Sequence, residues 1–410
     1  MTGNPYLSVV VPAYQVEPFL VRCLDSILTD TSADIEVVAV NDCSPDGCRL
    51  ILGEYARRDP RVRLVHLPAN VGLGQARNAG LDHATGDYIW FIDGDDWLPA
   101  GTVRSVIDRL KTTEPDVLVI DHAEVFDESR PLHGQSGNLL RGLTTPIRLA
   151  ERPQLLRLAQ SACTKVARRA FLADAGLRFR PGWYEDVSFS HPLLMAAGRI
   201  DVLDAVCYCY RQRPRGGITR TLSNRHFDVF EQYAGLFELV DTSAGAYDEF
   251  RPELFRLMIN HYLVIVGNDQ RLPIDMRPAF FQRIFEDYRR WRPAAGYPVP
   301  PGLTGLRHRL ARRGAYRTYA VLRRCYRTGT GLRRRLGVGR RPPVVGPSVA
   351  SAEVVAEPLA GLTAIGNATG RVGARTRQCP PEHTTSRAAG SVDLSLPAPK
   401  LAASRLSRPT

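Results

Sequence analysis

The sequence has no apolar run long enough to cross a membrane. A spanning helix needs about 20 consecutive apolar residues, and no window of the 410 residues approaches that length. The segment from Met1 to Tyr14 also lacks the basic stretch followed by an apolar run that marks a secretory signal. These absences argue against a membrane-spanning or secreted class, and we predict a cytoplasmic location.

Cysteines are present, but none has the spacing of a metal or redox motif. The eight cysteines include no Cys-x-x-Cys pair, and the two closest, Cys207 and Cys209, alternate as buried strand residues do. The sequence therefore predicts neither a zinc site nor a disulfide framework.

No Gly-x-Gly-x-x-Gly follows the first apolar run, Leu7–Val11. That absence argues against a dinucleotide oxidoreductase, because such enzymes bind the pyrophosphate on glycines at this place. A nucleotidyltransferase on a related sheet would need a glycine-rich phosphate loop with basic residues there, whereas the sequence has Pro-Ala-Tyr-Gln at residues 12–15. This class is kept as the enzymatic alternative.

Acidic residues are absent between Asp287 and Glu353, a stretch in which arginines recur. The formal net charge of +12 is therefore a local feature of the carboxyl-terminal part. Residues 226–340 have a mostly helical pattern, which predicts a helical, arginine-rich appendage. Residues 341–410 are rich in Pro, Ala, Ser, Gly and Thr without periodicity, which predicts a low-complexity, disordered tail.

Short apolar runs alternate with segments of helical length along the first 120 residues. The predicted strands are Leu7–Val11, Ile35–Val40, Val62–Leu67, Tyr88–Ile92 and Val117–Ile120. Strands rich in Val and Ile without polar alternation are buried on both faces. The pattern therefore predicts an α/β fold, a mostly parallel sheet flanked by helices. Farther along, Gln154–Phe171 is predicted to be helical and Val202–Arg211 to be a strand.

Carboxylates cluster directly after the strand that ends with Ile92, in the sequence Asp93-Gly94-Asp95-Asp96. Ligands of such sheets bind beyond the carboxyl ends of the strands, and carboxylate oxygens suit Mg²⁺ or Mn²⁺. The cluster predicts a divalent metal site that neutralises a diphosphate. A solvated acidic turn is the structural alternative.

Three further motifs precede the acidic cluster in the chain. They are Val10–Tyr14, Val40–Ser44 and Asn70–Gly80. With the acidic cluster they resemble, in order and spacing, the family 2 glycosyltransferases over about residues 6–220. The resemblance implies a Rossmann-like GT-A fold, a nucleotide-sugar donor and inversion at the anomeric carbon of the sugar.

The resemblance assigns donor-binding roles to individual residues. The residues that would line the base pocket are Pro12, Ala13, Tyr14 and Glu17. Asp42 would hydrogen-bond the base, and Arg77 would face the nucleotide. Gln15 replaces the usual Asn of the family, and Asn41-Asp42-Cys43-Ser44 replaces Asp-Asp-Gly-Ser. Taken singly, these residues also fit structural roles such as a strand end, core packing or a turn.

The same resemblance assigns a separate role to each residue of the acidic cluster. Asp93 would meet the ribose of the donor, and Asp95 would bind the Mg²⁺ or Mn²⁺ ion, with Asp96 in support. Residues 208–213, the end of a strand that carries Arg213, lead into a basic, glycine-bearing loop at residues 214–220. This loop would close over the diphosphate, since arginine forks suit phosphate oxygens. A plain solvated loop is the alternative.

Inverting transfer needs a base for the proton of the acceptor hydroxyl. The segment Pro181–Phe189 contains Glu185 and Asp186, and it resembles the Glu-Asp element of the family at the start of an acceptor-side helix. Asp186 is the proposed base, and Glu185 orients it or contacts the acceptor. Acidic residues also favour a first helical turn, so a helix cap is the alternative. Lys165 resembles an Asn-Lys element of the family, and its role is left open.

The resemblance also divides the chain into domains. Residues 1–225 are predicted to be the catalytic domain, with a donor half at 1–120 and an acceptor half at 121–225. The segment Leu306–Leu336 has the pattern of a basic amphipathic helix, which suits peripheral contact of residues 305–341 with the anionic inner face of the cell membrane. A charged, solvated helix packed on the catalytic domain is the alternative.

Two runs, Tyr184–Phe230 and Ala315–Tyr319, are similar to actinobacterial bifunctional proteins. In those proteins a family 2 domain precedes a CDP-glycerol glycerophosphotransferase domain, and no such second domain is recognised after Arg341.

The sequence thus predicts a metal-dependent, inverting glycosyltransferase. The donor is a nucleoside-diphosphate sugar, UDP-linked, and the acceptor is a glycan, a polysaccharide, a polyol-phosphate polymer of the cell wall or a lipid-linked molecule. Nucleic acid is not a predicted partner. The non-enzymatic alternative is a basic adaptor at a membrane surface.

Overall fold

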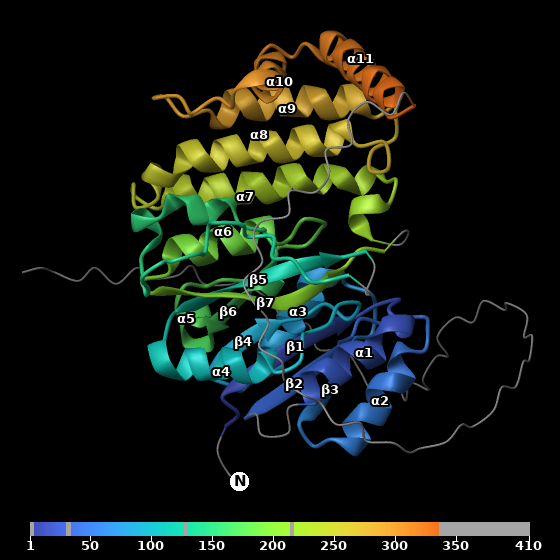
Figure 1. The fold of residues 1–410 in the computed structure, drawn as a ribbon, viewed down its shortest axis with the longest axis vertical. Helices are drawn as coiled ribbons and strands as arrows, with labels where there is room; N and C mark the ends of the chain where they lie inside the picture. Colours follow the sequence, from blue (N-terminus) through green and yellow to red (C-terminus); the bar gives the residue numbers. More distant parts are fainter. Residues whose placement is uncertain (1–3, 30–33, 127–129, 214–216, 336–410) are drawn as a thin grey trace, which may run out of the picture. The chain divides into compact units, whose positions relative to one another are not determined.

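The computed structural model describes residues 4–29, 34–126, 130–213 and 217–335 (Figure 1). The tail predicted for residues 341–410 lies outside these ranges. The strands are β1 Leu7–Ala13, β2 Ile35–Asn41, β3 Val62–His66, β4 Tyr88–Phe91, β5 Val117–Val125, β6 Lys165–Arg168 and β7 Ile200–Arg211. The helices are α1 Glu17–Leu28, α2 Cys48–Arg58, α3 Leu73–His83, α4 Thr102–Thr113, α5 Arg169–Asp174, α6 Val187–Ala196, α7 Asp228–Thr242, α8 Arg251–Gly267, α9 Arg277–Trp291, α10 Gly302–Arg312 and α11 Tyr316–Arg335.

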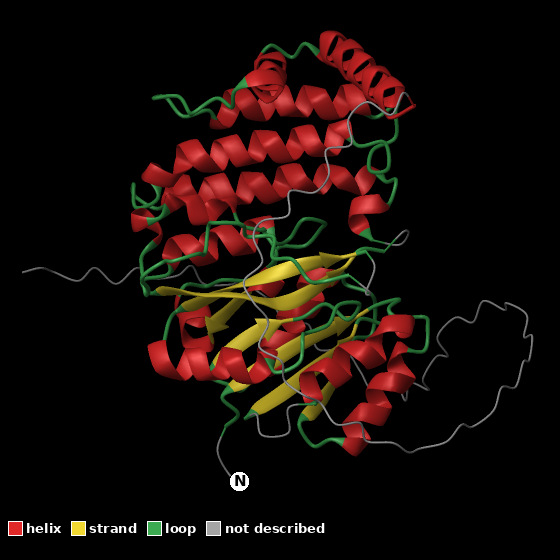
Figure 2. Ribbon diagram, in the orientation of Figure 1, coloured by secondary structure: helices red, strands yellow, loops and turns green. Residues whose placement is uncertain are grey.

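The strands form one sheet in the order β3-β2-β1-β4-β6-β5-β7 (Figure 2). Strands β1 to β4 are mutually parallel, β6 is antiparallel to both of its neighbours, and β5 pairs in parallel with β7. Ala13 pairs with Asn41, and Val10 pairs with Phe91. The carboxyl ends of β1, β2 and β4 therefore meet at one edge, where the predicted polar motifs follow each strand.

Both faces of the sheet are buried, as the apolar strands predict. Val9, Val11 and Trp90 belong to an apolar cluster with residues of α1, α2 and α4. Val10 and Phe91, which alternate with them, belong to a second cluster with residues of α3, α5 and α6. Successive side chains of a strand point to opposite faces, so these helices cover the sheet on its two sides. The predicted α/β fold is confirmed.

The helix predicted at Gln154–Phe171 is wrong. That segment contains two short 3-10 turns, Pro153–Arg157 and Ala162–Thr164, then strand β6 and the start of α5. Val166 pairs with both Trp90 and Leu118. Burial between two strands therefore outweighed the local helical pattern.

Helices α7 to α11 extend the second apolar cluster away from the sheet, in successive layers above α6 (Figure 1). Phe237 stacks on Trp291 at 5.3 Å between ring centroids, and Phe281 lies 5.0 Å from Tyr319. The prediction of a single helix over Leu306–Leu336 is wrong, because α10 ends before Gly314, whose φ is +62°. Among the described residues, no helix combines the length and the apolar character needed to cross a membrane.

Candidate active site

Arg77 is the centre of the polar cluster at the carboxyl edge of the sheet. It lies on α3 and is fully buried. Its Nη2 donates to Asp93 Oδ1 at 2.7 Å, and its Nη1 donates to Glu185 Oε1 and Asp186 Oδ1, both at 2.9 Å. One guanidinium thus joins the end of β4 to the start of α6. The structure brings together four residues that the sequence assigned to the donor and acceptor sides.

The approach of α3 to the Glu-Asp element depends on a small residue. A Cβ atom at Gly74 would lie 2.9 Å from the Glu185 Cγ atom and 3.1 Å from the Arg180 carbonyl oxygen. Both distances are shorter than ordinary carbon contacts. Glycine at this position therefore lets the first turn of α3 pack against the segment that carries Glu185.

The two carboxylates of the Glu-Asp element differ in accessibility. The Glu185 side chain is 4% exposed and that of Asp186 is 26% exposed. Burial raises the pKa of Glu185 to about 8; the neighbouring Asp186 adds to this shift and Arg77 opposes it. Burial also raises the pKa of Asp186, against the charge of Arg77. Asp186 is therefore the carboxylate that a substrate can reach.

The Asp186 side chain does not cap α6. Asp186 occupies the N-cap position of α6, but within the described residues its side chain makes no capping hydrogen bond. Instead its Oδ1 atom accepts from Arg77 and, at 3.2 Å, from the backbone N–H of Ala162. The carboxylate is thus turned toward the cluster and away from its own helix.

Lys165 supports the turn that holds Asp186. Its side chain is buried, and its Nζ donates to the Ser161 carbonyl at 2.9 Å and to the Thr164 hydroxyl at 3.0 Å. Burial lowers the pKa of Lys165 to about 8, and the charge of Asp186 opposes this shift. These bonds hold the 3-10 turn whose Ala162 N–H faces the Asp186 carboxylate.

Asp95 forms an ion pair with Arg213, with 2.6 Å between Oδ2 and Nη2. Burial raises the pKa of Asp95, and Arg213 is the main opposing influence. The backbone carbonyl of Asp95 accepts from Arg211 Nε at 2.9 Å. Arg213 therefore lies at the acidic turn. Residues 214–216 of the predicted closing loop lie outside the described ranges.

Asp96 is tied to the protein on both oxygens. Its Oδ2 accepts from the Tyr208 hydroxyl, and its Oδ1 accepts from the backbone N–H of Arg211 at 2.8 Å. The Tyr208 hydroxyl in turn accepts from the backbone N–H of Asp93 at 3.4 Å. Asp96 therefore anchors the acidic turn to β7. Tyr208 was not among the predicted site residues, and its alternation within a strand was the only signal for it.

The acidic turn offers part of the ligand shell of a divalent cation. Within the described part of the chain, no three His, Cys, Asp or Glu side chains are grouped as a metal centre. Mg²⁺ commonly binds through one or two carboxylates, with substrate phosphates and waters completing its shell. The Asp95 side chain, 13% exposed at the sheet edge, fits that donor set.

The predicted base pocket is divided between buried and exposed residues. Pro12 and Ala13 are buried at the end of β1, whereas Tyr14 and Glu17 are exposed. The Glu17 carboxylate accepts from the backbone N–H of Gly47 at 2.7 Å. This hydrogen bond joins the segments that follow β1 and β2. The exposed Tyr14 belongs to the first of these segments.

Asp42 braces the loop before α3. Its carboxylate accepts from the backbone N–H groups of Val71 at 2.8 Å and Gly72 at 3.0 Å, and from the Asn70 amide at 2.8 Å. Burial raises the pKa of Asp42, and the two backbone hydrogen bonds oppose this shift. The residue thus fixes the entry to α3, in addition to any contact with a base.

The sheet order and the acidic turn at its carboxyl edge define a GT-A fold. The family model described as glycosyl transferase family 2 matches residues 8–172. The chain therefore carries a family 2 glycosyltransferase domain, which confirms the resemblance drawn from the four motifs and favours it over a nucleotidyltransferase.

Curated relatives support this assignment. The chain is 33% identical over 218 residues to the uncharacterized glycosyltransferase EpsJ of Bacillus subtilis, covering 51% of this chain and 62% of that protein. It is 32% identical over 242 residues to the succinoglycan biosynthesis protein ExoO of Rhizobium meliloti, covering 55% of this chain and 66% of that protein. The chain thus spans less than two thirds of either relative.

The solved structure is that of residues 1–349 of S. aureus TarS in complex with UDP-GlcNAc. It superposes with a TM-score of 0.62 at 23% identity, covering 79% of this chain and 92% of that one. At this level of identity the likeness concerns the fold, and it extends beyond the family 2 domain into the helices that follow.

Proposed function

We propose that the protein transfers a sugar from a nucleoside-diphosphate sugar, with UDP as the nucleotide, to an acceptor hydroxyl with inversion at the anomeric carbon. The observation that carries the proposal is the position of Arg77 between Asp93 and Asp186. Inversion requires a base on the face of the sugar opposite the diphosphate. The contacts of Arg77 bring a donor-side and an acceptor-side carboxylate to one buried charge.

Asp186 is the proposed base. Its two protein hydrogen bonds both end on Oδ1, and among the described residues Oδ2 accepts none. The free Oδ2 atom would take the proton of the acceptor hydroxyl while the acceptor oxygen attacks the anomeric carbon. The bond between that carbon and the diphosphate oxygen breaks, and the nucleoside diphosphate leaves from the opposite face. The charge of Arg77 and the Ala162 N–H favour the ionised carboxylate and so oppose the effect of burial.

Glu185 is proposed to position Arg77 and not to take the proton. Its side chain is almost fully buried, and its raised pKa leaves it largely protonated at neutral pH. A carboxyl in that state is a weak base. It still fills the space beside the guanidinium and accepts one of its hydrogen bonds.

Asp93 and Asp95 are proposed to hold the donor. Asp93 would meet the ribose, and Asp95 would bind Mg²⁺ or Mn²⁺, which supplies charge neutralisation of the diphosphate when bound. Arg213 already pairs with Asp95, and its fork suits phosphate oxygens. We propose that Arg213 shifts from Asp95 to the diphosphate when the donor binds. The residues proposed to surround the nucleotide base are Pro12, Ala13, Tyr14, Glu17 and Asp42.

The acceptor is proposed to be a cell-wall polymer, a polysaccharide or a lipid-linked glycan. The name of ExoO, a succinoglycan biosynthesis protein, supports a surface polysaccharide. The division into a catalytic domain at 1–225, an appendage at 226–340 and a tail at 341–410 belongs to the same proposal. Peripheral membrane contact through residues 305–341 stays a prediction.

A donor screen followed by a base variant tests the proposal. Thermal shift with a panel of nucleotide sugars, with and without Mn²⁺, identifies the donor, because a ligand stabilises by mass action. Asp186→Asn should bind that donor as the wild type does, yet turn it over about 100-fold more slowly or worse. Asp82→Asn is the matched control, since Asp82 is an exposed carboxylate on α3. Wild-type turnover by Asp186→Asn would overturn the proposal.

A further inference from the structure

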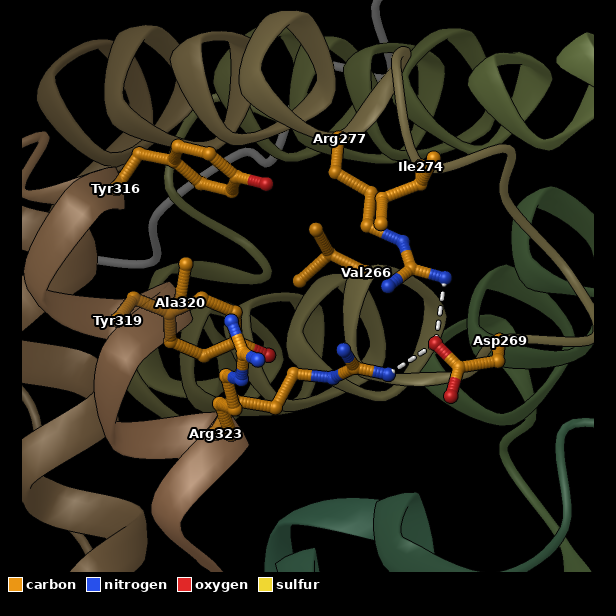
Figure 3. Close-up of a pocket in the computed structure, with 9 residues that line it drawn as sticks. Val266, Asp269, Ile274, Arg277, Tyr316, Tyr319, Ala320 and Arg323 are labelled. Atoms are coloured by element: carbon orange, nitrogen blue, oxygen red, sulfur yellow. Dashed lines mark hydrogen bonds and ion pairs between the residues drawn. The ribbon is translucent and has the colours of Figure 1, made fainter. Parts of the chain in front are cut away.

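A pocket of about 540 Å³ lies among α8, α9 and α11 (Figure 3). Small-molecule sites span about 300–1,000 Å³, and this volume lies within that range. Arginines and tyrosines dominate its polar lining, which consists of Asp269, Arg277, Tyr316, Tyr319, Arg323 and Arg324. None of the residues placed in the candidate active site lines it.

The lining has an excess of positive charge. Arg277 and Arg323 both pair with the same Oδ1 atom of Asp269, the former at 2.7 Å. Arg324 adds a third guanidinium to the lining, and among the described residues Asp269 is the one carboxylate named there. Burial lowers the pKa of Arg277, and the charge of Arg323 lowers it further. A second anion in the pocket would relieve this repulsion.

The two paired arginines are held in place by backbone carbonyls. Arg277 Nη2 donates to the Leu272 carbonyl at 3.1 Å, and Arg323 Nε donates to the Gly267 carbonyl at 3.1 Å. Groups that are already ordered lose less conformational entropy when a ligand binds. The guanidiniums are therefore preorganised around the cavity.

Tyrosine and apolar side chains complete the pocket. In Figure 3 the Tyr316 hydroxyl points toward the middle of the cavity, with Arg277 and Arg323 around it and Val266 behind. Tyrosine offers a ring face for the C–H groups of a sugar or polyol and a hydroxyl for a polar atom. The lining thus combines an anion site with a surface for a polyhydroxylated carbon chain.

We propose that this pocket binds a phosphate ester, with the phosphate on Arg277, Arg323 and Arg324 and the attached polyol or sugar against Tyr316 and Tyr319. Planar guanidinium forks match the geometry of phosphate oxygens, and several of them around one group favour a doubly charged anion.

One loop at the pocket also contacts the segment that precedes α7. Residues 268–276, between α8 and α9, carry Asp269 and Ile274 at the pocket. In the same loop the Arg271 carbonyl accepts from the backbone N–H of Ser223 at 3.0 Å. Burial raises the pKa of Tyr184, the neighbour of Glu185, to about 12, and the charge of Arg271 opposes this shift. This part of the inference rests on the proposed transferase function, under which the ligand would be a phosphate-bearing acceptor.

Direct binding to the full chain tests the pocket. The probes are glycerol 3-phosphate, inorganic phosphate and vesicles containing phosphatidylglycerol, measured by calorimetry and vesicle flotation. Arg324→Gln should weaken binding of glycerol 3-phosphate about tenfold or more, as expected for a lost charge-assisted hydrogen bond. Arg317→Gln, an exposed arginine on the same helix outside the pocket lining, should leave it unchanged. Tyr316→Phe should weaken the binding of glycerol 3-phosphate more than the binding of inorganic phosphate.

Other binding results would overturn all or part of the proposal. Equal losses in Arg317→Gln and Arg324→Gln, or binding to vesicles alone, would overturn the pocket in favour of diffuse charge attraction. Equal affinity for inorganic phosphate and ester would support the anion site but overturn the role of the tyrosines. Binding of the nucleotide-sugar donor to Arg324→Gln should be unchanged, which separates failure of this proposal from failure of the proposed function.

Discussion

The Arg77 guanidinium donates to the Asp186 carboxylate at 2.9 Å, although the two residues lie 109 positions apart. The guanidinium is buried, so its charge acts through a medium of lower effective dielectric than water. It favours the ionised state of Asp186 and also fixes where that carboxylate lies. A single side chain thereby controls both the charge and the position of the proposed base.

Replacement of Arg77 should therefore affect stability and catalysis together. Arg77→Met would leave buried carboxylates without their partner, which costs about 3–5 kcal/mol. Arg77→Lys keeps the charge but loses the fork, so we expect a smaller loss of stability and a large loss of turnover. Urea denaturation and turnover assays measure the two effects. The control is Arg178→Met, since Arg178 pairs with Asp82 at the surface. If Arg77→Met were as stable as this control, the buried cluster would not have the role assigned to it.

The Asp95–Arg213 pair predicts competition between Arg213 and a divalent cation. At pH 8, Arg213→Ala should bind Mn²⁺ more tightly than the wild type in the absence of nucleotide, because the carboxylate loses its internal partner. The same variant should bind the nucleotide-sugar donor more weakly, because the guanidinium that would bind the diphosphate is removed. Calorimetry with Mn²⁺ alone and with donor separates these effects. Asp95→Asn serves as the reference that should lose Mn²⁺ binding, and weaker Mn²⁺ binding by Arg213→Ala would contradict the pairing argument.

The raised pKa of Glu185 predicts a pH dependence of folding. Its carboxyl has an ordinary pKa of 4.5 and a folded-state pKa of about 8. Between these values the folded state holds a proton that the unfolded state has released, so stability falls as pH rises through this window. Glu185→Gln removes this titration. Urea denaturation at pH 5 and pH 8 should show the variant losing less stability than the wild type over that interval. Parallel pH profiles for the two proteins would show that Glu185 titrates normally.

The hydrogen bond between Tyr208 and Asp96 predicts a loss of stability when the Tyr208 hydroxyl is removed. Tyr208→Phe would leave one oxygen of the buried Asp96 carboxylate without its donor, at a cost of about 1–3 kcal/mol. The acidic turn would also lose its link to β7, so turnover should fall. Tyr326→Phe, at an exposed position on α11, is the control for hydroxyl removal. Equal midpoints of urea unfolding for the two variants would contradict this role for Tyr208.

Much of the donor half was predictable because its signals are local. Apolar runs such as Ile35–Val40 mark strands buried on both faces, and the polar residues directly after them have to lie at the carboxyl edge of a parallel sheet. The segment Gln154–Phe171 was mispredicted because β6 is a short strand between two others. Nothing in its own sequence shows the neighbours that bury Val166.

The sequence by itself determined the fold class, the order of the motifs and the set of charged residues at the sheet edge, because strand period and strand-end chemistry are properties of adjacent residues. Only the tertiary structure decided how those charges are shared. In the folded protein Arg77 contacts three carboxylates, and Asp96 is hydrogen-bonded to Tyr208. Asp95 is paired with Arg213. The Glu185 side chain is buried, whereas that of Asp186 is partly exposed. Hydrogen bonds and burial depend on partners far apart in the chain, so residue types alone cannot assign them.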